Sequence, residues 1–566
     1  WWVNERPKDS IFPCWDLEGM WRIQVPSTWN TAFEKLAFYE GYACYVKDFT
    51  SEELAEGTDA FLCFDGAVYS AEVWLNGVWV GKHECGYSPF QFRVTPYLQG
   101  QNRLMVFVEN YRKDDRVPGM IYDWHNDGGL IRPVKIVYTP ERHVENFQVR
   151  TALDGDEVVL TTVASFTSRD IQTPETIAVA IPELGVHGEQ TVAPGEKTAI
   201  VFRQPKERVS LWGYGNPKLY TVEVRCGEDV VTDEVGLREI KTQGPEILLN
   251  GKPIKLWGLA THSEFKHMGR TDTPELLDEF FAKIHDLGCN FVRCAHYPYS
   301  DAFVRKADRE GILLWEEVPA YWQARMDEPP VKALAFQMMR EMIDRDLNRA
   351  SVIIWSVSNE CEWKNPEGND GNYRYGIECA ALVRSLDPTR LISSAEAHVL
   401  MNDTPWNPAQ ADDFSYGKQG RHAWRPSLPD AYYEAMDILS MNNYAPPGSL
   451  AFDRNAVSGE VFAKYNKPIM ISEFGSVSLR GSDAPLDELG SDAGHADVVR
   501  RFYESFETMP WLAGAAIWNF CDIRSPIQWQ WFGSGLGVFR YGITDENWEP
   551  KQVYQVVKDF CHKHVK

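Results

Sequence analysis

The chain has 566 residues, of which 44% are apolar and 24% charged, and its formal net charge is −24. This length predicts about three or four domains, and the balance of apolar and charged residues excludes wholesale disorder. The negative charge repels phosphate backbones and anionic lipids, so we expect neither nucleic acid nor a membrane surface as a partner.

The sequence lacks the patterns of a membrane span, a signal peptide and a cysteine-based zinc site. No apolar run approaches the roughly 18 residues that span a bilayer, and the first residues, WWVNERPKDS, lack the pattern of a signal peptide. The 11 cysteines are dispersed, without a CxxC pair or a Cys/His cluster at zinc spacing. We therefore expect reduced thiols and a cytoplasmic location, with a removed leader as the open alternative because the chain begins without Met.

The first part of the chain reads as two β-sandwiches. Short alternating apolar runs between turn residues fill residues 1–140 and predict an antiparallel jelly-roll sandwich. Within it, Asn76-Gly77 separates two apolar runs, a strong hairpin signal. Residues 141–241 carry about seven further strand-like runs, the size of an immunoglobulin-like sandwich.

Residues 242–566 alternate strand-like and helical patterns. Thr273 and Ser300 can cap two helices that Gly288 and Gly311 would end. Eight strand candidates follow one another, namely IKLWGLA, NFVRCA, ILLWEEV, SVIIWSVSN, LISSAEA, DILSMNNY, PIMISEFG and GAAIWNF. They predict a (β/α)8 TIM barrel. An open doubly wound sheet is the alternative, but its first strand lacks a Gly-rich phosphate turn.

Polar side chains end nearly every one of these apolar strands, at the face where barrels carry their chemistry. They are His262, Glu264, Arg293, His296, Glu316, Glu317, Asn359, Glu360, Glu396, Asn442, Asn443, Tyr444, Glu473, Trp518 and Asn519. Buried parallel strands are normally apolar throughout, so polar groups aimed at one face predict a functional site.

Two carboxylates stand out, because Glu360 follows the fourth strand and Glu473 ends the seventh. A facing carboxylate pair without metal-ligand histidine spacing suits glycoside hydrolysis, with one acid and one nucleophile about 5 to 5.5 Å apart. We also expect a raised pKa for Glu360, caused by the like charge of Glu473. The competing hypothesis makes each Glu an ion-pair partner of a nearby Arg.

Several stretches resemble glycoside hydrolase family 2, which includes β-galactosidases, β-mannosidases and β-glucuronidases. WSVSNE, ISEFG, RCAHYP and DRDLNRASVIIWS resemble its barrel motifs, and FDGAVYSAEVWLNGVWVGKHECGYSPFQFRVT and DWHNDGGLIRPV resemble its N-terminal sandwich. The resemblance covers nearly the whole chain. It implies the domain order given above and a retaining mechanism with no metal and no cofactor.

The resemblance also implies roles for individual residues, which are given together here. Glu360 matches the acid/base, Glu473 the nucleophile, Asn359 the residue that holds the sugar 2-hydroxyl, Tyr444 the hydrogen-bond donor to the nucleophile, Trp518 the tryptophan under the sugar ring, His296 and His262 two motif histidines, and Asp123 an aspartate that the sandwich projects into the pocket.

Chain length and the PYS after HYP resemble the β-glucuronidase branch. That branch grips the sugar carboxylate with an Asn-x-Lys pair, which Phe539-Arg540-Tyr541 replaces here. Arg540 is then the candidate cation for a sugar carboxylate. Arg293 is a weaker candidate for the same role, and the alternative is that it braces Glu473 or Glu360.

These observations predict an exo-β-glycosidase that removes one sugar from a small-molecule or oligosaccharide β-glycoside. The favoured substrate is a β-uronide, with galacturonide ahead of glucuronide, and a neutral β-galactoside is the alternative. An endo-acting or mannoside-specific enzyme and a noncatalytic carbohydrate-binding protein stay open. We expect a homo-oligomer. The segments 397–430, with Trp406 and Trp424, and 363–375 are expected to shape the pocket.

Overall fold

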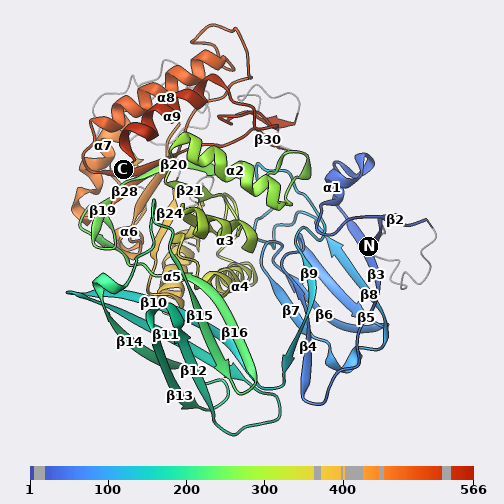
Figure 1. The fold of residues 1–566 in the computed structure, drawn as a ribbon. Helices are drawn as coiled ribbons and strands as arrows, with labels where there is room; N and C mark the ends of the chain where they lie inside the picture. Colours follow the sequence, from blue (N-terminus) through green and yellow to red (C-terminus); the bar gives the residue numbers. More distant parts are fainter. Residues whose placement is uncertain are drawn as a thin grey trace.

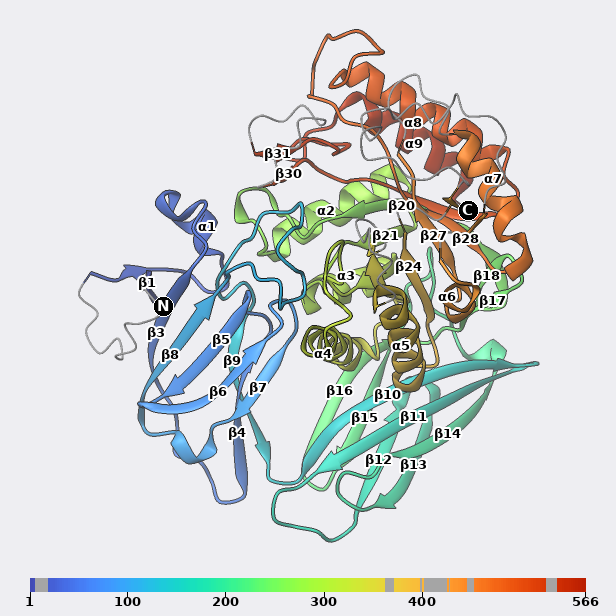
Figure 2. The ribbon, with the colours of Figure 1, turned by 180° about the vertical axis from the view of Figure 1, so that it is seen from behind.

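The computed structural model describes residues 1–5, 19–361, 371–396, 400–401, 425–426, 428–444, 452–525 and 537–565. They form an N-terminal β-sandwich, an immunoglobulin-like sandwich and a C-terminal barrel, which confirms the predicted fold class (Figure 1). Both sandwiches lie against the barrel, the first at its side and the second below it in the views of Figures 1 and 2. In the part of the chain that the structure describes, no helix is long and apolar enough to cross a membrane.

The N-terminal sandwich consists of two antiparallel sheets in the orders β2-β1-β3-β8-β5-β6 and β7-β4-β9. The strands are β1 Trp2–Glu5, β2 Trp21–Arg22, β3 Tyr42–Thr50, β4 Thr58–Phe64, β5 Ser70–Leu75, β6 Val78–Glu84, β7 Phe90–Arg93, β8 Gln101–Glu109 and β9 Val134–Pro140. Asn76 and Gly77 join β5 to β6 with φ angles of 53° and 82°. This is the positive-φ hairpin turn that the Asn-Gly pair predicts.

The immunoglobulin-like domain packs the sheets β10-β11-β14 and β13-β12-β15-β16 against each other. Its strands are β10 His143–Asp154, β11 Glu157–Thr167, β12 Glu175–Ile181, β13 Val186–Val192, β14 Thr198–Pro205, β15 Leu219–Cys226 and β16 Asp229–Gly236. Asn348 of the barrel accepts the Val149 N–H at 2.9 Å and donates to the Phe147 carbonyl at 3.1 Å. This domain is therefore bonded to the barrel through its first strand.

A small sheet of β17 (Ile240–Gln243), β18 (Glu246–Leu249) and β19 (Lys252–Ile254) leads into the barrel. The barrel strands run parallel in the order β24-β23-β22-β21-β20-β29-β28-β27, and a bridge between Glu396 and Met441 joins the two end strands. Their bounds are β20 Leu256–Thr261, β21 Phe291–Cys294, β22 Leu313–Glu317, β23 Val352–Asn359, β24 Leu391–Ala395, β27 Leu439–Asn442, β28 Ile469–Phe474 and β29 Leu512–Ile517. Each overlaps one of the eight predicted runs; β20 extends one residue past its run and β29 begins two residues before its run.

The helices of the described residues are α1 Trp29–Ala32, α2 Pro274–Leu287, α3 Asp301–Glu310, α4 Pro329–Asp346, α5 Gly371–Leu386, α6 Asp430–Ala435, α7 Phe452–Phe462, α8 Asp492–Glu507 and α9 Gln552–His564. The predicted caps are present: Thr273 accepts from the Leu276 N–H at the start of α2, and Ser300 accepts from the Phe303 N–H at the start of α3. Gly288 and Gly311 end these helices with φ angles of 72° and 73°, which glycine adopts at little cost.

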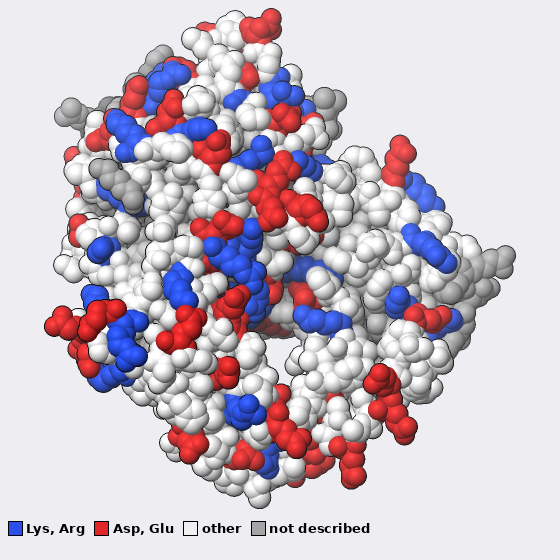
Figure 3. All heavy atoms as spheres, in the orientation of Figure 1, with Lys and Arg blue, Asp and Glu red and all other residues white. Residues whose placement is uncertain are grey.

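Because all barrel strands are parallel, their C-terminal ends meet at one mouth of the barrel. The connection between β8 and β9 runs from the sandwich to the barrel in Figure 1, and Trp124 within it contacts the rings of His296 and Tyr321. The face shown in Figure 3 mixes acidic and basic side chains and is hollowed between the sandwich and the immunoglobulin-like domain.

Candidate active site

Glu360 follows β23 and sits at the barrel mouth with a left-handed backbone, φ 52°. Its own N–H donates to the Ala395 carbonyl at 2.7 Å, which ties this strained residue to the neighbouring strand. Its carboxylate accepts from Asn442 Nδ2 at 2.8 Å and from Trp322 Nε1 at 2.9 Å. The hydrogen-bond donors recorded on this carboxylate are thus neutral.

Glu473 lies in β28 and has different partners. Its Oε1 accepts from Arg293 Nη1 at 2.5 Å, and the Tyr444 hydroxyl donates to its Oε2. His296 Nε2 lies 3.9 Å from Oε1. A cation and a phenol therefore hold this carboxylate, and both stabilise its ionised form.

Arg293, at the end of β21, is fully buried and joins several strand ends. Besides Glu473, its guanidinium donates to both oxygens of Glu317 at 3.1 Å and to Asn359 Oδ1 at 2.7 Å. Asn359 Oδ1 also accepts from Asn442 Nδ2 at 3.1 Å. The suggestion that Arg293 braces Glu473 is confirmed.

Burial is the main cause of the pKa shifts at both carboxyl groups. It raises the pKa of Glu360 to about 7, with the Asp123 charge adding to the rise and the donors Asn442 and Trp322 opposing it. The expected direction is present, but burial rather than like-charge repulsion is the largest cause; repulsion between the two carboxyl groups contributes to the rise at Glu473. Burial also raises the pKa of Glu473 to about 7, opposed chiefly by Arg293.

Aromatic rings enclose the space beside the two carboxylates. The rings of His296 and Trp518 are stacked with centroids 5.2 Å apart, and His262 meets Trp518 edge-on at 5.1 Å. His262 Nδ1 bonds the Tyr297 hydroxyl at 3.1 Å, while its buried Nε2 has no partner in the described structure. These side chains form a flat apolar wall with a few polar edges, the usual make-up of a ligand pocket.

The sandwich contributes Asp123 and Trp124 to the same site. Trp124 is fully buried and its ring lies 4.9 Å from that of Tyr321 and 5.9 Å from that of His296. Asp123 is bonded by the Tyr321 hydroxyl, and burial raises its pKa to about 6. Its Oδ1 is buried without a partner in the described structure, so it can accept a hydrogen bond from a ligand.

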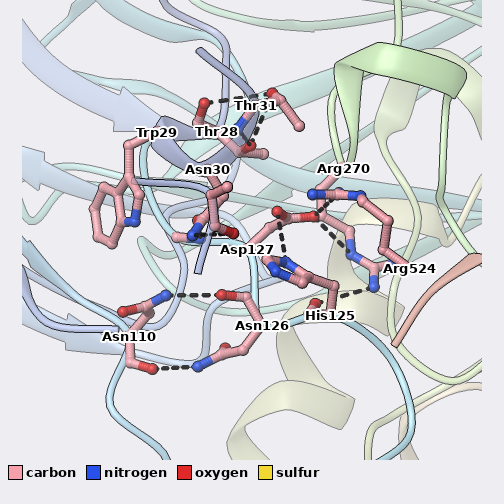
Figure 4. Close-up of polar contacts among 12 residues, drawn as sticks. Thr28, Trp29, Asn30, Thr31, Asn110, His125, Asn126, Asp127, Arg270 and Arg524 are labelled. Carbon is pink, nitrogen blue, oxygen red and sulfur yellow. Dashed lines mark hydrogen bonds and ion pairs between the residues drawn. The ribbon is translucent and has the colours of Figure 1, made fainter. Parts of the chain in front are cut away.

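A charged cluster fixes this sandwich segment on the barrel (Figure 4). Asp127 accepts from Arg524 Nη2 at 2.6 Å and lies 3.7 Å from Arg270 Nε, both from the barrel part of the chain. Asp127 also bonds His125 Nδ1 at 3.0 Å. Because Asp127 is completely buried, these opposite charges compensate its lost hydration and fix the position of the neighbouring Asp123.

Arg540 is not brought together with the carboxylate pair. Its Nη1 lies 3.3 Å from Asp522 and 3.9 Å from Glu546. The next residue, Tyr541, is buried and meets Tyr444 edge-on at 5.4 Å. Burial raises the pKa of the Tyr541 phenol, and the charges of Glu473, Asp123 and Glu360 add to this rise. Tyr541 therefore faces the site from this segment.

Three aromatic residues of the site were not predicted from the sequence, namely Trp322, Tyr321 and Trp124. Tyr321 and Trp322 stand just past β22, so extending the search a few residues beyond each strand end would have found them. Trp124 adjoins Asp123, which was named. Trp406, Trp424 and residues 363–370 lie outside the described residues.

Comparison with known proteins gives matches along the chain. The family models described as "Glycosyl hydrolases family 2, sugar binding domain", "Glycosyl hydrolases family 2" and "Glycosyl hydrolases family 2, TIM barrel domain" match residues 10–140, 142–238 and 240–559. A β-glucuronidase of Streptococcus agalactiae is 26% identical, covering 96% of this chain and 95% of its own. A β-galactosidase of Thermoanaerobacter pseudethanolicus is 28% identical over 56% of this chain and 44% of its own.

Among solved structures, a β-galacturonidase from Eisenbergiella tayi bound to glycerol superposes with a TM-score of 0.85 at 24% identity, covering 100% of this chain and 95% of its own. A β-D-glucuronidase from Dictyoglomus thermophilum gives a TM-score of 0.82 at 24% identity, with 100% and 96% covered. At such identity the likeness concerns the fold.

The Trp322 hydrogen bond predicts a shift in pH dependence. Its N–H favours the charged form of Glu360, so Trp322→Phe should raise the Glu360 pKa above about 7 and move the alkaline limb of kcat/KM to higher pH, by up to about one unit. The profile is measured with the best substrate from a nitrophenyl β-glycoside panel. Trp212→Phe, which removes a bond to the remote Asp308 carbonyl, is the control. If the alkaline limb of kcat/KM in Trp322→Phe stays in place or moves to lower pH, Trp322 does not stabilise the ionised form of Glu360.

Proposed function

The chain belongs to glycoside hydrolase family 2, and from this premise we propose that it is a retaining exo-β-glycosidase with Glu473 as nucleophile and Glu360 as acid/base. The observation that carries the assignment is the contrast between the two carboxylates. Arg293 and Tyr444 hold Glu473, whereas the neutral donors Asn442 and Trp322 hold Glu360. The first setting favours a carboxylate and the second tolerates a proton.

In the first step, a Glu473 oxygen attacks the anomeric carbon while Glu360 gives its proton to the departing glycosidic oxygen. The bond from the sugar to the leaving group breaks, and an α-linked glycosyl ester to Glu473 forms. Both carboxyl groups have a pKa raised to about 7, so near neutral pH the pair holds a proton; Arg293 and Tyr444 favour the ionised form of Glu473, which leaves this proton on Glu360 as the acid.

In the second step, Glu360 is a carboxylate and removes a proton from water, which attacks the same carbon and releases Glu473. Two inversions restore the β configuration. The donors Asn442 and Trp322 stabilise Glu360 while it is ionised, and Arg293 stabilises Glu473 when it leaves.

Neighbouring groups have roles in binding and orientation. Two donors, Arg293 and Asn442, fix Asn359 Oδ1, so the amide N–H of Asn359 can donate to the sugar 2-hydroxyl. The flat wall of Trp518 and His296 suits the apolar face of a sugar ring. Asp123 and Trp124 close the mouth from the sandwich side, which supports release of a single terminal sugar.

The sugar class has two candidates. Relatives named β-glucuronidase that align over nearly the whole chain favour a β-uronide. Within this class we keep galacturonide ahead of glucuronide, because Phe539-Arg540-Tyr541 replaces the Asn-x-Lys pair of the β-glucuronidase branch. The described side chains favour the other candidate, a neutral β-galactoside, because Arg293, Arg540 and Lys551 are each paired with a carboxylate and Tyr541 is the residue turned to the site. An unpaired sugar carboxylate beside Asp123 would be costly to bury. We place the neutral sugar first.

The alternative is a noncatalytic carbohydrate-binding protein. Such a protein would not require two buried carboxylates, one paired with a cation and the other held by neutral donors. Groups of this kind are costly to bury and persist where chemistry uses them.

Glu473→Gln and Glu360→Gln are each expected to lower kcat by about 1,000-fold or more, since neither amide can attack carbon or donate a proton as required. Circular dichroism should show an unchanged fold. Near wild-type turnover in either variant would refute the assignment.

Azide distinguishes the two roles. With an activated nitrophenyl glycoside, azide should rescue Glu473→Ala by forming the α-glycosyl azide and Glu360→Ala by forming the β-glycosyl azide. Proton spectra of the product assign the configuration, and exchanged products would mean exchanged roles.

Tyr444→Phe is expected to lower kcat by about 10- to 100-fold with little change in KM, because its hydroxyl orients and polarises Glu473 mainly in the transition state. Tyr554→Phe, which loses a bond to Asp286 on the outer helices, is the matched control. A change confined to KM would make Tyr444 a sugar contact instead.

The sugar class is tested with p-nitrophenyl β-galactoside, β-galacturonide and β-glucuronide. We expect wild-type kcat/KM to favour the galactoside by about 100-fold or more, and Arg540→Ala to affect all three substrates alike. A wild type that prefers the galacturonide, together with a selective loss in Arg540→Ala, would establish the uronide candidate and Arg540 as its cation.

A further inference from the structure

The sandwich and the barrel meet at a second cluster of titratable side chains, away from the mouth. His83 is the second-last residue of β6, Cys85 is the first residue after this strand, and Glu341 lies on the barrel helix α4. One ligand atom of each residue lies within 4.8 Å of the other two. In Figures 1 and 2, α3 and α4 are the barrel helices nearest the sandwich.

The hydrogen bonds within this cluster leave coordination capacity unused. One ring nitrogen of His83 contacts Glu341 Oε1 at 2.9 Å, and Gln337 Nε2 donates to the same oxygen at 2.8 Å. The other ring nitrogen of His83 and Glu341 Oε2 are buried without a partner in the described structure. The Cys85 thiol makes one long contact, 3.8 Å to the Leu334 carbonyl. Buried polar atoms of this kind normally have a partner.

We propose that His83, Cys85 and Glu341 bind a divalent cation of the zinc type, which clamps the N-terminal sandwich to α4 of the barrel. A thiolate, an imidazole and a carboxylate are a donor set that selects Zn²⁺ and similar borderline metals over Ca²⁺ or Mg²⁺. This proposal is independent of the glycosidase assignment, because none of the three residues lies at the barrel mouth.

Charge balance supports a divalent ion. A thiolate and a carboxylate carry two negative charges, which one Zn²⁺ neutralises, so the loaded site is neutral in buried surroundings. Binding forms metal–sulfur, metal–nitrogen and metal–oxygen bonds and releases the thiol proton, together with any imidazolium proton, to solvent. The fourth ligand of a tetrahedral ion would be a water molecule.

The local backbone brings the three groups close to coordination distance. Cys85 has a φ of 110°, unusual for a residue other than glycine, which turns the chain sharply after β6. The His83 ring is held by stacking on Phe90, with centroids 4.2 Å apart. Ligand atoms of a tetrahedral zinc site are about 3.3 to 3.7 Å apart, so closure around an ion requires shifts of about 1 Å.

The test uses the full chain, stripped with a chelator and then titrated with Co²⁺ and afterwards Zn²⁺. We expect one Co²⁺ per chain with a thiolate-to-cobalt charge-transfer band, which Zn²⁺ abolishes by displacement. Elemental analysis should find one Zn²⁺ per chain in the reloaded protein and almost none in Cys85→Ser or Glu341→Gln. Cys226→Ser, a buried thiol of the immunoglobulin-like domain, is the matched control and should retain the metal.

Glu341 is partly exposed on α4, so Glu341→Gln keeps the test informative if a change at the fully buried Cys85 prevents folding. Zn²⁺ should also raise the thermal unfolding temperature of the wild type and the control but not of Glu341→Gln. Absence of the charge-transfer band, or metal uptake equal in Glu341→Gln and the control, would overturn the proposal. Loss of hydrolysis in Glu473→Gln tests the other proposal separately.

Discussion

One buried guanidinium organises the mouth of this barrel. Arg293 carries a full charge with no exposed surface, and such a charge is stable only where carboxylates and other acceptors surround it. Its partners Glu473, Glu317 and Asn359 come from three other strands, so the strand ends must converge for the charge to be compensated. Removing Arg293 would leave Glu473 and Glu317 as neighbouring buried carboxyl groups, and at least one of them would take up a proton.

The two catalytic candidates differ because of this one cation. Arg293 touches Glu473 directly, whereas it reaches the Glu360 region only through Asn359 and Asn442. The carboxylates are buried to a similar extent and both have a pKa raised to about 7, so their different partners decide which of the two carries a shared proton. The arrangement gives one acid and one base within a single low-dielectric site.

The barrel could be predicted because the sequence signals for its strands and helices each lie within a few neighbouring residues. Each strand is a continuous apolar run, and caps such as Thr273 and Ser300 are encoded within a few residues of the helices that they start. Glu360 and Glu473 could be chosen because they interrupt such runs. The orientation of Arg540 could not be predicted in the same way. Neighbouring residues point in opposite directions, and the motif does not fix which one faces the site. The cluster at Glu341 is also invisible to local spacing, because 258 residues separate it from His83.

The segment that carries Asp123 and Trp124 belongs to one domain but completes the cavity of another, and Asp127 anchors it there with charges from the barrel. The reacting groups and the shape of the cavity are thus encoded in separate folding units. Substitutions or length changes between β8 and β9 can alter which glycoside fits while Glu360, Glu473 and Arg293 stay unchanged. Selectivity for a glycoside can therefore evolve, or be engineered, in a domain that carries neither Glu360 nor Glu473.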